Sequence, residues 1–233
     1  MNEFETRDVR DRRFTAWVAI GAALLMFATI ALSLGATGDD TALFFDPAKV
    51  FALPASRITL FRWWMVVDIF GFYLPFLILG GYLWRQLRET GGALVDMAAL
   101  SVALYVLLGI AGASIQFAVL PALLAAHGTG DAAVRAASEA SWLTTVIGSQ
   151  RGLWAMEGPV LAFWGIVTGN ALRTRGMANG TVLIMAGLAY ALNYIASILD
   201  AAVASEMLTI SAVLLLPVWA LWFGVTLLHG NSL

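Results

Sequence analysis

Two stretches of the sequence place an arginine and an acid in apolar surroundings. In "RWWMVVDIF" Asp68 follows Arg62 by six positions, and in "RGLWAMEG" Glu157 follows Arg151 by the same interval. Six residues correspond to about 120° around a helix, so an arginine and an acid on one helix do not face each other. We therefore expect each arginine to pair with the acid of the other helix, either directly or through a water molecule.

A carboxyl group in an apolar helix can bind a proton or a polar solute. At 1.5 Å per residue, Asp68 lies about 15 Å from the predicted helix start at Ile58, near the middle of a hydrocarbon layer of about 30 Å. An ionised carboxylate at that depth costs several kcal/mol unless it is paired, hydrated or protonated. Two neighbouring carboxylates would not both stay ionised there. This reasoning predicts protonation linked to solute binding.

Other polar residues in apolar segments extend this candidate site. Pro75 and Pro159 follow the acids closely, and proline loosens the hydrogen bonding of a helix that spans a membrane. A bent helix beside a buried acid would leave room for a ligand. The predicted ligand-binding residues are Arg62, Asp68, Gln116, Arg151, Glu157, Asn193 and Tyr194. The alternative is structural, with the acids tying helices together and the arginines holding lipid phosphates.

The elements that would position these residues are membrane-spanning helices. The chain is 61% hydrophobic and 12% charged, and its mean hydropathy is +0.84; both point to lipid as the solvent. We predict an all-α, polytopic membrane protein with a single domain (1–233) and six transmembrane helices. The predicted spans are 14–34, 58–84, 95–120, 147–172, 180–199 and 207–228.

Two short helices are expected between these spans. Asp46 and Pro47 suit the N-cap and the first position of a helix. The alanine-rich segment 130–143 is predicted to form a surface helix on the same side of the membrane as the helix that begins at Pro47.

The distribution of arginines predicts the orientation. Eight of them fall on one side of the predicted spans: Arg7, Arg10, Arg12, Arg13, Arg85, Arg88, Arg173 and Arg175. The positive-inside rule then places both termini in the cytoplasm. The apolar stretch of the first span is too long for a cleaved signal peptide, so we expect it to be retained.

Several function classes are excluded by the sequence. There is no cysteine for a disulfide or an iron–sulfur cluster, and no predicted span contains the lysine that a retinal Schiff base needs. His127 and His229 are predicted on opposite sides of the membrane, and no metal-binding motif occurs, so no metal site is expected. A net charge of −2 without a basic stripe argues against a nucleic-acid partner. The sequence identifies no cofactor and no catalytic residue.

The stretches "LFRWWMVVDIF" and "LRTRGMANGTVLIMAGLAY" resemble a bacterial family of six-span membrane proteins, a domain of unknown function (DUF4386). The shared features are a basic N-terminus, an extended first outer loop, the Arg-x5-Asp spacing of Arg62 and Asp68, and an "aGlxY" pattern that ends at Tyr190. The usual proline before the glycine of span five is replaced here by Asn179, and span four lacks histidine. The resemblance implies a six-span fold in the bacterial inner membrane and a role for Arg62 and Asp68, but no activity.

Three hypotheses for the function remain open. The leading one is a small transporter or a solute- and proton-binding protein with a buried acidic site at Asp68 and Glu157. The second is a structural or accessory subunit of a membrane complex, in which the acids clamp helices. The third is an intramembrane enzyme acting on lipid, although no nucleophile or metal ligand is evident. The predicted partners are the lipid bilayer, further copies of the chain, or other membrane subunits.

Overall fold

The computed structural model describes residues 3–38, 40 and 42–230, and throughout these residues the regular structure is helical. The α-helices are α1 (Glu3–Thr37), α2 (Pro47–Phe51), α3 (Ala55–Asp68), α4 (Leu74–Thr129), α5 (Ala132–Val146), α6 (Glu157–Thr174), α7 (Asn179–Ile198) and α8 (Ala202–Leu228). A short 3₁₀ turn, η1 (Leu43–Phe45), precedes α2. Two π-helical segments, η2 (Ile69–Tyr73) and η3 (Ile147–Trp154), interrupt longer helices. The all-α prediction is confirmed for the described residues.

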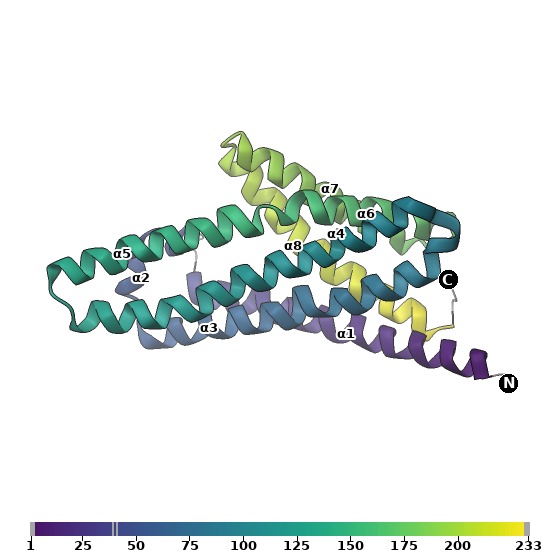
Figure 1. Cartoon of the computed structure of the whole chain (residues 1–233), viewed down its shortest axis with the longest axis horizontal. Coiled ribbons are helices and arrows are strands. Elements are labelled where there is room, and N and C mark those ends of the chain that lie inside the picture. Colours follow the sequence, from purple (N-terminus) through teal and green to yellow (C-terminus); the bar gives the residue numbers. More distant parts are fainter. Residues whose placement is uncertain (1–2, 39, 41, 231–233) are drawn as a thin grey trace.

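Helix α4 consists of two antiparallel arms. Gly92 lies between them with φ 53° and ψ −141°, a left-handed conformation that glycine adopts without a steric penalty. Beside this reversal the Trp84 indole N–H donates to the Asp96 carboxylate at 2.7 Å. Figure 1 shows the chain reversing at this end of the molecule. The predicted spans 58–84 and 95–120 therefore lie side by side as a helical hairpin.

Four helical stretches in the described chain are long and apolar enough to cross a membrane. They are Asp8–Thr37, Ala55–Thr129, Asn179–Ile198 and Val203–Leu228. The predicted span 147–172 is absent from this set. It is divided into η3 and α6, and the 18 residues of α6 include the charged residues Glu157 and Arg173. A membrane protein with apolar helices is thus supported by length and composition.

The buried side chains form two hydrophobic cores. The first, here called the lower core, includes Phe76, Trp164 and Trp219 and draws on α1, α4, α6, α7 and α8. The second, here called the upper core, includes Phe61 and Trp142 and draws on α1, η1, α2, α3, α4 and α5. Because α7 and α8 contribute only to the lower core, their connecting hairpin stands apart from the other helices (Figure 1).

Glycines allow α6 and α7 to approach closely. A Cβ atom on Gly169 would lie 2.6 Å from the Gly180 carbonyl oxygen, and one on Gly165 would lie 3.0 Å from that of Leu183. Small residues at this spacing are a common means of packing two helices in a membrane. The spacing of Gly165 and Gly169 in the sequence therefore corresponds to a real helix contact.

The two short helices predicted between the spans are both present. The Asp46 side chain caps α2 by accepting a hydrogen bond from the Lys49 backbone N–H, and Pro47 is the first residue of the helix. Helix α5 occupies most of the predicted segment 130–143, and most of its side chains up to Ala137 are exposed. At the opposite end of the bundle, the Arg12 guanidinium donates to the Gly230 carbonyl at 3.3 Å, which places the start of α1 beside the end of α8 (Figure 1).

Candidate acidic centre

Asp68 is the last residue of α3, and a π-helical turn follows it directly. Its side chain is buried, with 6% of the residue exposed. The Leu74 N–H bonds to the Ile69 carbonyl five residues earlier, which is the π pattern. Pro75 has no N–H to continue the α-helical ladder, and this accounts for the wider turn before it. The bend predicted from Pro75 is therefore present as a π turn.

This wider turn brings Tyr73 to Asp68. In a regular α-helix two residues five positions apart differ by about 140° in direction. A π turn contains more residues, so the same interval comes closer to one full turn. The Tyr73 side chain lies near the Asp68 carboxyl as a result.

Glu157 reaches the same place from the opposite side of the fold. It begins α6, directly after the break that follows η3, and it too is 6% exposed. A carboxyl in the first turn of a helix is favourably placed for the helix dipole. Tyr73 and Asp68 both lie near Glu157. The predicted burial of both acids is confirmed; their meeting at a similar depth stays a prediction.

Two more tyrosines complete what we call the acidic centre: Asp68, Tyr73, Tyr105, Glu157 and Tyr190. Tyr105 packs against the Tyr73 ring at 5.2 Å, and Tyr190 lies near Tyr105 and both carboxyl groups. Glu157 Oε1 and the Tyr105 hydroxyl are buried without a hydrogen-bond partner among the described residues. Buried polar atoms of this kind require a proton, a water molecule or a ligand to satisfy them.

The acidic centre lies where the two cores meet. Met65, one turn before Asp68, belongs to the upper core, and Phe72 belongs to the lower core. In the other segment Trp154 packs against the upper core, whereas Leu161 belongs to the lower one. The acids thus form a polar layer enclosed by apolar side chains on both sides.

The predicted direct arginine–acid ion pairs are absent from the described part of the chain. The Arg62 guanidinium lies over the ring of Phe117, 4.9 Å from its centroid, and Arg151 lies over Phe45 at 4.7 Å. Both arginines are exposed, and neither forms an ion pair within the described part of the chain. About 9 Å of helix rise separates each arginine from its acid, and an aromatic face near the boundary offers a cation a closer partner than a deep carboxyl does.

Gln116 lies on the upper-core side of the acidic centre. It is fully buried, and its side-chain oxygen accepts a hydrogen bond of 2.8 Å from Gln150 of η3. Its amide nitrogen lies 3.4 Å from the Gly112 carbonyl. This pair connects α4 with η3 close to Phe117, which Arg62 covers.

Asn193 and Tyr194 contact residues other than the two acids. Asn193 accepts a hydrogen bond of 2.7 Å from Ser205 at the start of α8, so it connects α7 with α8. The Tyr194 hydroxyl lies 3.7 Å from the Met156 sulfur, beside the start of α6. The binding role predicted for these residues and for Arg62, Gln116 and Arg151 stays a prediction.

Tyr73, Tyr105 and Tyr190 are the members of the acidic centre that the sequence did not identify as site residues. All three are tyrosines within long apolar helices, where a hydroxyl needs a polar partner. That rule could have drawn attention to them. The proximity of Tyr73 to Asp68 depends on the π turn, which residue spacing does not reveal.

Comparison of the chain with protein-family models, with curated proteins and with solved structures finds no match. The resemblance to the six-span family stays a prediction.

Proposed function

We propose that this protein is a proton-binding membrane protein of the transporter type, in which the acidic centre takes up and releases a proton as a small solute binds. The observation that carries the proposal is the pair of buried carboxyl groups, which have no cation partner in the described structure. In apolar surroundings such groups are stabilised by a proton or a bound cation.

The proposed topology has six crossings in the bacterial inner membrane with both termini in the cytoplasm. Ala55–Thr129 counts as two crossings because it reverses at Gly92. Together η3 and α6 supply a further crossing, about 26 residues long, which is enough for a hydrocarbon layer of about 30 Å. The arginine distribution supports the orientation.

The two π segments support a transporter rather than a rigid anchor. Each adjoins an acid, η2 after Asp68 and η3 shortly before Glu157. A π turn contains weaker or displaced backbone hydrogen bonds, and such turns often occur at functional sites. A helix can change its bend at such a turn without breaking a regular hydrogen-bond ladder. The proposed motion would alter access to the carboxyl groups.

Infrared difference spectroscopy on the purified protein tests the proton site. Between acidic and alkaline buffer, we expect a carbonyl band of a buried carboxylic acid that is lost in Glu157→Gln and altered in Asp68→Asn. Asp96→Asn is the control, because Asp96 is exposed beside Trp84. A band that survives in both site variants contradicts the proposal.

A second candidate, a structural subunit, is favoured by one observation. Tyr73 lies near both acids, so in this candidate function it joins its own segment to α6. If the acids are a clamp, Tyr73→Phe lowers the stability of the fold. Proteoliposomes with the wild-type protein or any of the variants then take up protons no faster than protein-free vesicles do. If the centre carries protons, the wild-type protein moves them, and Asp68→Asn and Glu157→Gln do not.

A further inference from the structure

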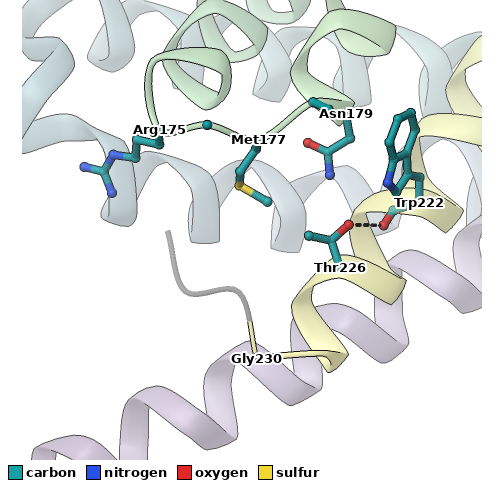
Figure 2. A pocket seen from close by; sticks show the side chains of 8 residues that line it. Arg175, Met177, Asn179, Trp222, Thr226 and Gly230 are labelled. Atoms are coloured by element: carbon teal, nitrogen blue, oxygen red, sulfur yellow. Dashed lines mark hydrogen bonds between the residues drawn. The ribbon is translucent and has the colours of Figure 1, made fainter.

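A second polar feature lies at the far end of α6 from Glu157. There a cavity of about 530 Å³ lies between the turn that connects α6 to α7 and the last turns of α8 (Figure 2). It is lined by Arg175, Gly176, Met177, Ala178, Asn179, Trp222, Thr226 and Gly230. It shares no residue with the acidic centre, and nothing that follows depends on the function proposed above.

Asn179 is the buried polar group of this cavity. Only 1% of the residue is exposed, and neither its amide oxygen nor its amide nitrogen has a hydrogen-bond partner among the described residues. Figure 2 shows the side chain directed into the space between Met177 and Thr226. An asparagine amide offers two donors and one acceptor atom. A molecule that satisfies it must therefore supply both an acceptor and a donor.

The charge around the cavity favours an anion. Arg175 is the single charged residue among those that line it; its guanidinium donates to the Thr90 hydroxyl at 3.2 Å and is directed away from Met177 and Asn179 (Figure 2). Arg12 approaches from α1, where it donates to the Gly230 carbonyl, and its Nε is buried without a partner in the described structure. An acidic group in this cavity would have Arg175 and, at the Gly230 edge, Arg12 as nearby cations, and no described lining residue is a carboxylate.

The cavity also adjoins an apolar surface. Trp222 lines it and is 45% exposed. Val218, Leu221 and Val225 are exposed on the same helix. Tryptophan is enriched where a membrane protein passes through the headgroup layer. A ligand here could place a polar head against Asn179 and an apolar chain along α8.

We propose that this cavity binds the headgroup of a phospholipid that carries a hydrogen-bond donor beside its phosphate, as phosphatidylglycerol and phosphatidylethanolamine do. The phosphate accepts from the Asn179 amide nitrogen, and the headgroup hydroxyl or ammonium donates to the amide oxygen. Arg175 and Arg12 add attraction for the phosphate. The acyl chains lie beside Trp222 on the exposed face of α8.

Native mass spectrometry of the full chain, delipidated in detergent and titrated with lipid, tests the proposal. Phosphatidylglycerol should bind more tightly than phosphatidylcholine, which has a phosphate but no headgroup donor. Asn179→Leu should weaken phosphatidylglycerol binding about tenfold, as expected for the loss of hydrogen bonds to a charged group. Asn170→Leu, the same change at an exposed position near this end of α6, should leave it unchanged.

Two further measurements keep the proposal open to refutation. Replacing an unpartnered buried amide by an apolar group of similar size does not destabilise a fold, so Asn179→Leu should keep its melting temperature in lipid-free detergent. Arg175→Gln should weaken binding less, by an amount that falls as salt increases. Equal binding to Asn179→Leu and Asn170→Leu overturns the proposal. Equal affinity for phosphatidylcholine, or for free glycerol phosphate, also overturns it.

Discussion

The segments Arg62–Asp68 and Arg151–Glu157 have the same spacing but different structures. In both, the arginine lies over a phenylalanine ring and the acid is buried. Asp68, however, ends a helix before a π turn, whereas Glu157 begins a helix after one. Equal spacing therefore gave equal burial but not equal surroundings.

The two acids also differ in which chain segments supply their neighbouring tyrosines. Asp68 has Tyr73 in its own segment, five residues further along the chain. Glu157 depends on tyrosines from other helices, and one of its oxygens stays without a partner in the described structure. The surroundings of Asp68 are thus set largely by local sequence, and those of Glu157 by tertiary packing.

The largest expected effect comes from displacing Tyr73. A Cβ atom on Gly109 would overlap the Tyr73 ring, so Gly109→Leu should lower the free energy of unfolding by about 3 kcal/mol, the upper range for an overpacked core. Gly112→Leu, which would displace Trp154 near Glu157, should cost less because Trp154 is only half-buried. Unfolding in detergent measures both. Gly81→Leu is the control because open space surrounds Gly81; a loss there as large as at Gly109 would contradict the assigned packing.

Apolar replacement of the two acids should change stability in opposite directions. Glu157→Met removes a buried carboxyl of which one oxygen has no partner in the described structure, and should raise the free energy of unfolding by about 1–2 kcal/mol. Asp68→Leu should lower it, because Tyr73 then loses a partner in its own segment. The melting temperatures of the two variants at one pH decide the matter. Destabilisation by Glu157→Met would mean that a bound partner satisfies the carboxyl.

The tyrosine hydroxyls provide a smaller test of the same difference. Tyr73→Phe should cost about 1 kcal/mol because its hydroxyl lies between the two acids. Tyr105→Phe should be close to neutral, since the Tyr105 hydroxyl has no partner in the described residues. Chemical unfolding of the two single variants and the double variant measures the effects. Equal costs would show that Tyr105 has a partner, such as a buried water molecule.

The arginines should matter less than their regular spacing suggests. Arg62→Gln and Arg151→Gln each remove a cation–π contact at an exposed site, worth about 0.5–1 kcal/mol. Neither should shift the infrared carboxyl band, because neither arginine contacts an acid. A shift in either variant would restore the arginine–acid pairing that the structure contradicts.

The smallest expected effect on stability concerns Asp40, an acid that has an ion-pair partner. Lys49 lies 2.7 Å from Asp40 in an exposed loop, and its hydrogen bond holds the pKa of Asp40 below the ordinary value of 3.8. Because the pKa of Asp40 is lowered in the folded state, the pair stabilises the fold at pH values above the ordinary pKa. This stabilisation is lost as the pH falls through the pKa of the folded state. Wild type and Lys49→Gln should therefore show the same pH dependence of stability near neutrality. An NMR titration of Asp40 should show its pKa rise in the variant; an unchanged pKa would rule out the pair in solution.

The helices were predictable because their apolar runs are long, and burial of the acids followed from their depth in such runs. The surface helix and the Asp46 cap were also predictable, since both depend on local residue preferences. The predicted span 147–172 proved less regular, because its glycines and polar residues admit a π segment and a break.

The partners of the acids were not predictable in the same way. The expected arginine pairing relied on charge, whereas the structure satisfies the arginines with Phe45 and Phe117. Tyr73 lies near Asp68 because a π turn precedes Pro75. Such a turn shifts the helical register by one residue. Residue spacing assumes a regular helix, so it fails where a proline alters that regularity.

The length of α4 beyond Gly92 has one further consequence. The arm continues to Thr129, roughly 37 residues or on the order of 55 Å, whereas the hydrocarbon layer is about 30 Å thick. In the topology proposed above, its last turns and most of α5 project into water. Proteases, antibodies or a neighbouring cell-envelope protein would meet this projection before any lipid-embedded helix, so limited proteolysis of intact membranes should cut the chain first near Gly130.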